Sequence, residues 1–382
     1  MAEIHGRCDE RFESVRDALA RNLDSGEELG ASLVLDIDGD IVIDVWGGFR
    51  DQDRTVPWTE DTITNVWSTT KTVTSLAALM LVDRGELDVD APVARYWPEF
   101  AAAGKQDVLV RHVMSHSSGV SGLDQPAAVE DMYDWEHAIA RFAAQAPWWE
   151  PGTASGYHAL NYGHLVGAIV RRISGSTLKE FVAEQIAGPL GADFQIGAAE
   201  SDWGRIADVV PPPPLPFDFA ALDPASPAVK TLTGPFITAD VANTPGWRGA
   251  DIGAANGHGN AHSVARVMSV VSRGGEVDGV RLLGRDTVEL IFREQQNGID
   301  LALGVPLRLG IGYGLPQRDL VSWLPDEKIC FWGGWGGSMI VMDVGRRMTI
   351  SYMMNKMGAG IIGSERSTEY GQAIYDVVAK LA

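Results

Sequence analysis

The stretch Trp67-Ser68-Thr69-Thr70-Lys71 opens the segment that decides the fold. From Ser68 the chain runs without Gly or Pro as far as Arg84, and residues 76–82 on the way are all apolar. This pattern is typical of a helix that is apolar on nearly all sides in its second half and is therefore buried. Ser68 and Lys71 share one face of such a helix, so the amine can take the hydroxyl proton. The segment predicts a buried helix that carries a nucleophile and its base.

The same short pattern, S-x-x-K, occurs a second time at Ser176 and Lys179. There Thr177 and Glu180 fit a capping box in front of an ordinary amphipathic helix, so we interpret Ser176 as a turn or cap residue. An N-cap is also the alternative interpretation of Ser68. What favours catalysis at Ser68 is burial, because an apolar setting depresses the pKa of a lysine and leaves its amine neutral. The motif alone does not decide the function.

Strand patterns lie near both ends of the chain, and helical patterns lie between them. Before Ser68, the spacing predicts a helix over 11–23 and a β-hairpin whose strands, 31–37 and 41–46, flank Asp38-Gly39-Asp40. The last third predicts a helix over 262–272, strands around 329–331, 338–343 and 348–353, and a closing helix over 367–381. Two lobes are therefore expected, an α/β lobe built from both termini and an inserted helical lobe.

The helical lobe is expected over 86–244 and the α/β lobe over 1–85 and 245–382. Within the helical lobe, 131–145 and 160–173 have the clearest helical spacing. Residues 205–244, which include a run of prolines from Pro211, have little periodicity, and we expect a long ordered loop that lies over the active site.

The composition excludes several classes of protein. The 382 residues carry a formal charge of −20, which opposes binding to nucleic acid or to anionic membranes. The chain has no apolar stretch of about eighteen residues, and its first residues lack a signal pattern, so a cytoplasmic location is expected. Cys8 and Cys330 lie far apart without clustered His, which indicates neither a disulfide nor a metal site. No cofactor is expected.

Two further motifs follow the first in order. One is Gly156-Tyr157-His158-Ala159, preceded by Trp149-Glu150-Pro151-Gly152, and the other is Trp332-Gly333-Gly334, followed by Trp335-Gly336-Gly337-Ser338. Supporting matches lie at 109–119 and 257–261. With these motifs the chain resembles the serine β-lactamase and penicillin-binding protein superfamily over nearly its whole length. It most closely resembles the family VIII carboxylesterases, which share the class C β-lactamase fold.

The resemblance implies a fold of the α/β (α+β) class, with an antiparallel sheet flanked by helices and an all-helical lobe. It implies that Ser68 is the nucleophile, that Lys71 is its base, and that Tyr157 relays the proton, its phenol kept acidic by nearby cationic character. The backbone N–H groups of Ser68 and Trp335 would form the oxyanion hole. Substrate binding is assigned to Trp332, Gly333, Gly334, Trp335 and His258. The alternatives are a buried structural Tyr157 and a purely structural glycine-rich strand end.

Two departures from the β-lactamase pattern bear on the substrate. Ala159 stands where an amide would contact a lactam, and Trp332 stands where a cation would meet a substrate carboxylate. Efficient β-lactam turnover is therefore not expected, and flat apolar esters are favoured. His116 and His258 lack a motif that places them beside Ser68, and the chain has no G-x-S-x-G elbow. Most of the twelve tryptophans are expected to be packing residues, and the minority that face the cleft would suit a bulky aromatic or alicyclic ester.

The sequence thus predicts a serine carboxylesterase that hydrolyses esters, including bulky or aromatic esters and lactones, through an acyl-enzyme at Ser68. The alternatives are an acyltransferase and a D-aminopeptidase or β-lactam-directed hydrolase of the same fold. A further alternative, from a different class, is a non-catalytic binding protein. The expected partner is a small-molecule ester or lactone, and the oligomeric state, a homo-oligomer included, stays open.

Overall fold

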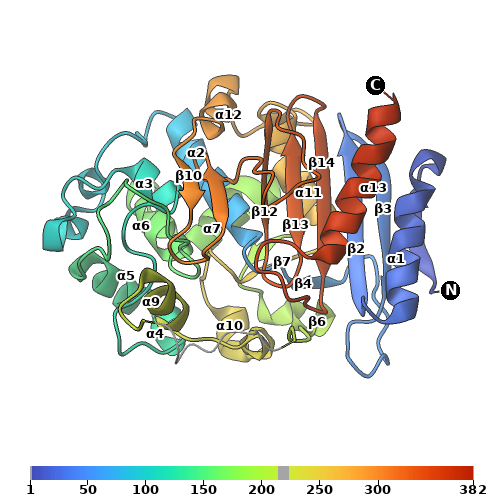
Figure 1. Cartoon of the computed structure of the whole chain (residues 1–382), viewed down its shortest axis with the longest axis horizontal. Coiled ribbons are helices and arrows are strands. Elements are labelled where there is room, and N and C mark those ends of the chain that lie inside the picture. Colours follow the sequence, from blue (N-terminus) through green and yellow to red (C-terminus); the bar gives the residue numbers. More distant parts are fainter. Residues whose placement is uncertain (1, 214–222, 382) are drawn as a thin grey trace.

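A six-stranded antiparallel sheet built from both ends of the chain forms one side of the protein (Figure 1). The computed structural model describes residues 2–213 and 223–381. The strands of the sheet are β1 (Ile4–Cys8), β2 (Gly30–Ile37), β3 (Asp40–Gly48), β12 (Ile329–Gly333), β13 (Met339–Asp343) and β14 (Met348–Met354). Their order is β1-β3-β2-β14-β13-β12, so the predicted N-terminal hairpin pairs directly with the C-terminal strands.

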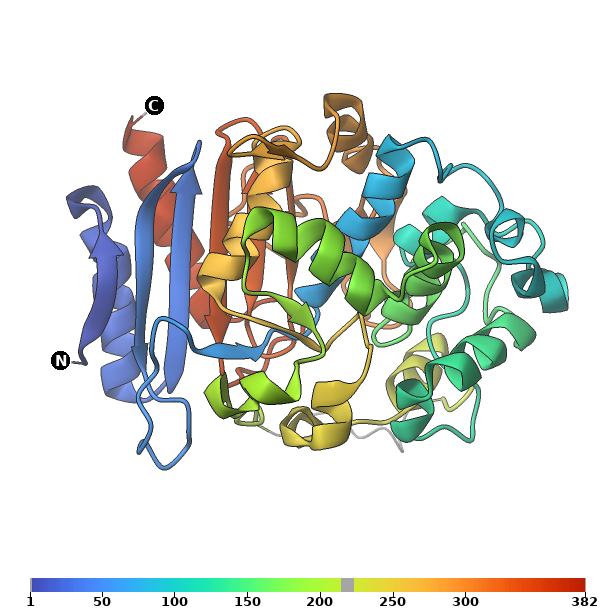
Figure 2. The ribbon, with the colours of Figure 1, turned by 180° about the vertical axis from the view of Figure 1, so that it is seen from behind.

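Helices cover both faces of this sheet. On one face α1 (Glu13–Ser25) packs against α13 (Glu365–Leu381), and on the other α11 (Ala261–Ser272) contacts β2, β13 and β14 (Figures 1 and 2). The buried residues of α1 are Val15, Ala18, Leu19 and Leu23. This helical spacing gives α1 one apolar stripe, which explains why it lies on the sheet.

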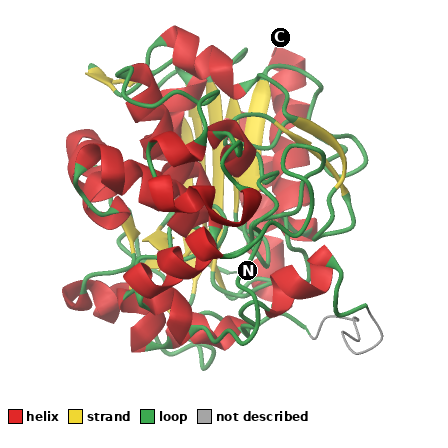
Figure 3. Cartoon of the chain, turned by 90° about the vertical axis from the view of Figure 1, so that its left-hand side faces the viewer, coloured by secondary structure: helices red, strands yellow, loops and turns green. Residues whose placement is uncertain are grey.

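The helix that begins after Ser68 is the centre of the molecule. It is α2 (Thr70–Asp83), and every residue from Thr70 to Leu81 is buried, as the apolar run predicted. It packs against α6 (Tyr162–Ser174), and Figure 3 shows the helical side of the molecule with the strands behind it. The other α-helices are α3 (Val110–Met114), α4 (Glu130–Tyr133), α5 (Trp135–Ala144), α7 (Leu178–Val182), α8 (Gly188–Leu190), α9 (Pro227–Thr233), α10 (Pro245–Gly249) and α12 (Arg285–Ile291).

Small sheets, none of them predicted, and short helices fill the rest of the described chain. One four-stranded sheet has the order β5-β7-β4-β6, and β8–β9 and β10–β11 are two-stranded. These strands are β4 (Ile63–Asn65), β5 (Gln195–Ile196), β6 (Ile206–Ala207), β7 (Gly257–Gly259), β8 (Glu276–Val277), β9 (Val280–Arg281), β10 (Gln296–Ile299) and β11 (Pro306–Leu309). The 3-10 helices are η1 (Glu10–Phe12), η2 (Val93–Arg95), η3 (Pro98–Gly104), η5 (Glu200–Arg205) and η7 (Ala239–Asn243), and η4 (Ala183–Ala187) is a π-helix.

Two of the expected segments differ from the structure. The helix expected over 131–145 is broken at Asp134, whose side chain accepts a hydrogen bond of 3.1 Å from the backbone N–H of His137 and so caps α5. The loop expected over 205–244 contains the short helix α9, and its residues 214–222 lie outside the described part of the chain. The boundaries of the two expected lobes remain predictions. Among the described residues, no helix has the length and apolar character needed to cross a membrane.

Candidate active site

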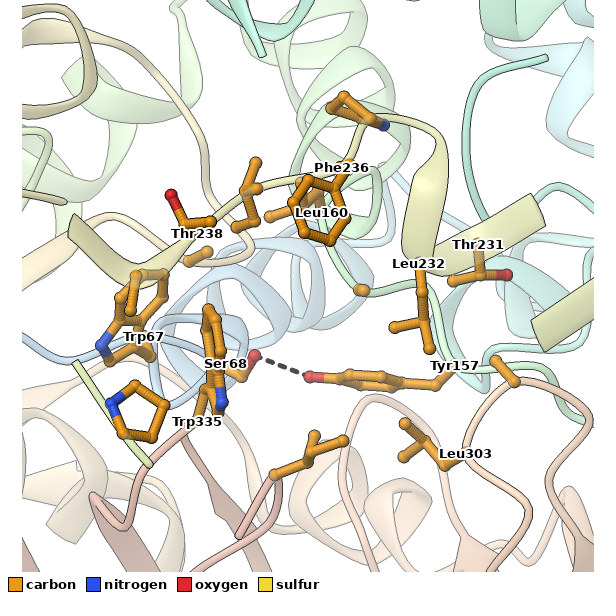
Figure 4. Close-up of a pocket in the computed structure, with 18 of the residues that line it drawn as sticks. Trp67, Ser68, Tyr157, Leu160, Thr231, Leu232, Phe236, Thr238, Leu303 and Trp335 are labelled. Atoms are coloured by element: carbon orange, nitrogen blue, oxygen red, sulfur yellow. Dashed lines mark hydrogen bonds between the residues drawn. The ribbon is translucent and has the colours of Figure 1, made fainter. Parts of the chain in front are cut away.

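Ser68 lies at a sharp turn between β4 and α2. The residue before it, Trp67, has a left-handed backbone with a φ of 49°, a conformation that is costly for a residue with a side chain and is typical of functional sites. The helix begins only at Thr70, so Ser68 precedes it, whereas we expected Ser68 in its first turn. Ser68 is 8% exposed and lines a cavity of about 790 Å³ (Figure 4). The turn therefore presents the hydroxyl to a pocket.

Two side chains converge on the Oγ atom of Ser68. The hydroxyl of Tyr157 donates to it at 2.7 Å, as Figure 4 shows. The Nζ atom of Lys71 lies 3.1 Å from it. Lys71 Nζ also donates to the carbonyl oxygens of Ala159, at 2.7 Å, and Ala254, at 2.9 Å. Burial lowers the pKa of Lys71 well below its ordinary value. A neutral amine has two N–H bonds, which these carbonyls accept, and one lone pair, which is left for Ser68.

The phenol of Tyr157 is a proton donor, contrary to the expectation that cationic surroundings would make it acidic. Burial raises the pKa of Tyr157 above the ordinary tyrosine value, although its hydrogen bond to Ser68 works in the other direction. The Lys71 Nζ atom lies 4.7 Å from the centre of the tyrosine ring, but a neutral amine supplies no cation there. Burial lowers the pKa of Lys71 and raises that of Tyr157, so it favours the neutral form of both side chains, which is the opposite of the acidic phenol that we expected.

Tyr157 lies in a loop that histidines hold in place. The backbone N–H of Gly156 donates to the carbonyl of His116 at 2.8 Å, and that of His158 donates to His116 Nδ1 at 3.1 Å. The ring of His158 in turn shares hydrogen bonds with Ser118 Oγ, at 2.6 Å, and with the Gly156 carbonyl, at 2.7 Å. Burial lowers the pKa of His116 well below its ordinary value, so its ring is neutral. These contacts make His116 a support of the loop.

The segment that follows β12 lies close to the turn that holds the nucleophile. A Cβ atom built on Gly334 would lie 2.7 Å from the Val66 carbonyl oxygen and 3.1 Å from Trp67 Cβ, so only glycine permits this approach. Trp335, the next residue, lines the cavity together with Ser68 (Figure 4). Neither the Ser68 nor the Trp335 backbone N–H donates a hydrogen bond to any described residue. This arrangement suits an oxyanion hole, which needs unpaired donors.

Trp332 does not face the cavity, so its assignment to substrate binding was wrong. It is 3% exposed, packs with Leu307 and Leu309, and its ring centre lies 5.5 Å from that of Tyr157. Its indole N–H donates to the Tyr157 hydroxyl oxygen over 3.4 Å. Gly333 and Gly334 are also absent from the cavity lining among the described residues. The indole therefore supports the tyrosine from behind.

The same correction applies to His258. It is fully buried in β7, and its Nδ1 atom shares a hydrogen bond of 2.8 Å with the Asn256 carbonyl. It does not belong to the cavity lining. The motif around His258 therefore belongs to the four-stranded sheet β5-β7-β4-β6 and not to the lining of the cavity.

The cavity wall comes largely from segments without a motif. The described part of the proline-rich segment contributes about half of the lining residues, and the loop between β10 and β11 contributes residues 301–304. Aromatic surface comes from Trp67 and Trp335, with Phe236 at an exposed position (Figure 4). Asp240 is the one charged side chain among the described lining residues. The pocket can accept a large apolar molecule, and the described part of its lining offers a substrate carboxylate no cation.

Comparisons with known proteins agree with this geometry. A family model described as Beta-lactamase matches residues 15–368. The crystal structure of a family VIII carboxylesterase is similar with a TM-score of 0.92 and 38% identity, covering 98% of this chain and 100% of that one. A penicillin-binding protein homologue from Caulobacter crescentus is similar with a TM-score of 0.90 and 37% identity, over 98% and 100% of the two chains. Esterase/beta-lactamase LipL from Mycobacterium tuberculosis is 35% identical, over 99% of this chain and 89% of that protein. The expected fold class is confirmed.

Proposed function

This chain belongs to the beta-lactamase family, and from that premise we propose that it is a serine carboxylesterase whose substrates are bulky or aromatic esters, lactones included. The observation that carries the proposal is the contact of both Lys71 Nζ and Tyr157 OH with Ser68 Oγ beside an apolar cavity. Similarity to a family VIII carboxylesterase and to an esterase of Mycobacterium tuberculosis supports the choice of an ester bond.

The first half of the reaction forms an acyl-enzyme. Lys71, neutral in its buried site, takes the proton of Ser68 as the Oγ atom attacks the ester carbonyl. The oxyanion then accepts hydrogen bonds from the backbone N–H groups of Ser68 and Trp335. Tyr157 gives its proton to the leaving alkoxide, and the Trp332 indole N–H stabilises the phenolate for that moment. The Lys71 ammonium returns a proton to Tyr157, so both groups end neutral.

The second half reverses these proton transfers. Water attacks the acyl carbonyl and gives one proton to the Tyr157 and Lys71 pair, and Ser68 Oγ leaves with that proton. The carboxylic acid is released, and the three side chains return to their starting protonation states. Every proton transfer uses only Lys71 and Tyr157, the two side chains that contact Ser68 Oγ.

Charge favours an ester over a β-lactam antibiotic. Such antibiotics carry a carboxylate, while the cavity contains Asp240 and no described Lys, Arg or His. The protein as a whole carries a formal charge of −20, which adds repulsion. Trp332 and Ala159 occupy the positions where the family's cation and amide would hold a lactam. We therefore expect weak turnover of anionic lactams and efficient turnover of uncharged esters.

The proposal is tested by comparing the protein with its Ser68→Ala variant on an aryl butyrate, a macrocyclic lactone and a chromogenic cephalosporin. We expect the aryl butyrate and the lactone to be hydrolysed, the cephalosporin to react slowly, and Ser68→Ala to lose all three activities. Ser176→Ala is the matched control, since Ser176 heads the second S-x-x-K segment, and it should keep full activity. Undiminished ester cleavage by Ser68→Ala would disprove the mechanism. A protein with none of the three activities would be a binding protein that keeps the fold.

Acyl transfer to an alcohol is a second candidate, and the size of the cavity favours it. About 790 Å³ leaves room for an alcohol beside an acyl chain, and the apolar walls offer water few hydrogen-bond partners. The difference is measured by adding an alcohol to the hydrolysis assay and separating the products. Formation of the new ester at the expense of the acid would identify a transferase, and exclusive release of the acid would identify a hydrolase.

A further inference from the structure

A buried carboxylate joins the Tyr157 loop to the cavity wall. Asp300, between β10 and β11, is fully buried, and its Oδ1 atom accepts three backbone hydrogen bonds. The donors are the N–H groups of Tyr157 at 3.0 Å, Ala302 at 2.9 Å and Leu303 at 2.9 Å. Its Oδ2 atom is buried and has no partner among the described residues. One oxygen atom thus contacts two separate parts of the site.

The loop that Asp300 begins is short and closed on itself. The Asp300 N–H donates to the Val305 carbonyl at 2.9 Å, and the Gly304 N–H donates to the Asp300 carbonyl at 2.8 Å. A further bond of 2.8 Å joins the Leu301 N–H to the Ser155 carbonyl, two residues before Tyr157. Residues 301–304 all line the cavity. Any movement of this loop therefore moves the wall against which a substrate lies.

The Tyr157 loop depends on this contact. The N–H groups on either side of Tyr157 bond to His116, and the N–H of Tyr157 itself bonds to Asp300. No described Lys or Arg forms an ion pair with Asp300, so the three N–H dipoles are what offsets its charge. Burying a carboxylate that only N–H dipoles stabilise costs desolvation free energy, and an apolar residue would suffice if the position served packing alone.

We propose that Asp300 is a positioning residue that sets the place of the Tyr157 phenol and of the cavity wall 301–304 together. The inference rests on the proposed function of Tyr157 as the proton donor. Without the carboxylate, the phenol drifts from Ser68 Oγ and the wall loosens at the same time. Burial raises the pKa of the Tyr157 phenol, and the negative charge of Asp300 raises it further, so both keep the phenol protonated.

The first test is kinetic and uses Asp300→Ala and Asp300→Asn. A displacement of the phenol by about 1 Å lowers kcat by about 10²-fold, so Asp300→Ala should lose that much kcat even on a small aryl acetate. A bulky ester, which reaches the wall, should show a rise in KM in addition. Asp300→Asn keeps one acceptor oxygen and should recover part of both losses. Asp343→Asn is the matched control, since Asp343 is also fully buried and accepts a backbone N–H, that of Arg346, at 2.9 Å.

The second test is amide hydrogen exchange, which needs no activity. The segments 155–158 and 301–304 should exchange faster in Asp300→Ala and be largely restored in Asp300→Asn. Unchanged exchange in either segment, or wild-type kcat in a folded Asp300→Ala protein that merely melts earlier, overturns the proposal. The proposed function fails separately, through full activity of Ser68→Ala, and exchange would still report whether Asp300 joins the two segments.

Discussion

At the residue scale, burial sets the protonation state of every group that contacts Ser68. The same desolvation that leaves Lys71 neutral keeps the proton on Tyr157, so a base and an acid lie on either side of one hydroxyl. Neither state needs a neighbouring charge. The site is therefore poised for proton transfer mainly by its apolar surroundings.

Removal of the phenol hydroxyl tests the assignment of Tyr157. Tyr157→Phe should lower kcat by about 10²–10⁴-fold, because the leaving alkoxide loses its proton donor. Tyr162→Phe is the matched control, since Tyr162 is equally buried and its hydroxyl bonds to Ser75 at 2.7 Å instead of to Ser68. The control should lose about 1 kcal/mol of stability and keep its activity. Equal kinetic losses in the two variants would refute the assignment.

The neutral state of Lys71 predicts the pH dependence of activity. The folded pKa of Lys71 is depressed, so kcat/KM should fall at low pH, where the amine becomes protonated. It should stay constant as the pH approaches the ordinary lysine value of 10.5. The profile is measured with an uncharged aryl ester. A rise of activity near pH 10 would mean that the lysine is charged at neutral pH.

The same depressed pKa predicts a pH dependence of stability. Between the depressed pKa of folded Lys71 and the ordinary value of 10.5, the unfolded chain binds a proton at Lys71 that the folded chain does not, so raising the pH through this window favours the folded state. The free energy of unfolding should therefore increase with pH by about 1.4 kcal/mol per unit more in the wild type than in Lys71→Met. Urea unfolding of the two proteins at several pH values measures the difference. Parallel curves would contradict the prediction.

The sequence predicted the three residues that the structure brings together, Ser68, Lys71 and Tyr157, because each lies in a motif and the motifs follow in order. It could not identify Asp300, since a single aspartate in a loop has no pattern and its contacts come from residues far away in the chain. It misplaced Trp332 for a related reason. A motif shows which position a residue occupies, whereas the packing of Leu307 and Leu309 decides which way its side chain faces.

At the scale of the elements, the long periodic segments were predictable and the short ones were not. The helices α1, α2, α6, α11 and α13 and the strands β2, β3, β12, β13 and β14 lie close to their predicted ranges. Strands of two to four residues, such as β5 and β7, are too short for an alternation to develop. They form by pairing in this small sheet: β7 pairs with β4, which leads to Ser68, and β5 pairs with β7.

The close approach of β12 to the Ser68 turn yields a prediction for Gly334. Gly334→Ala would place a methyl group 2.2 Å from Ser338 Oγ and 2.7 Å from the Val66 carbonyl oxygen, so the Trp335 amide must move. Loss of one oxyanion donor should lower kcat by about 10²–10³-fold. Gly249→Ala is the control, because nothing lies within 4 Å of a Cβ atom at Gly249. Normal kinetics in Gly334→Ala would remove Trp335 from the oxyanion hole.

At the scale of the whole molecule, a buried ion pair joins the two ends of the chain. Glu28 is fully buried, its Oε2 atom accepts from Arg366 at 2.5 Å, and its Oε1 atom accepts from the hydroxyl of Tyr370 at 3.1 Å and from that of Tyr352. Arg366 lies in α13, and Glu28 precedes β2. The pair thus connects the predicted N-terminal and C-terminal parts of the sheet lobe.

Glu28→Gln should destabilise the protein by about 3–5 kcal/mol, because it leaves the buried Arg366 without an anion. Glu369→Gln removes an exposed pair with Arg21 that also joins the two ends, and should cost about 0–1 kcal/mol. Urea unfolding measures both changes, and kcat of the folded protein should be unchanged in both. Equal effects of the two substitutions would show that the buried pair contributes no more than a surface one.

The pairing of β2 with β14 has a consequence for how the protein is made. The N-terminal hairpin leaves the ribosome early, but the strand that completes its inner edge, Met348–Met354, lies almost at the other end of the chain. At about 5–20 residues per second, the apolar edge of β2 waits for roughly tens of seconds of translation. During that time the edge is open to pairing with other nascent chains, a hazard that a shorter separation between the two strands would reduce.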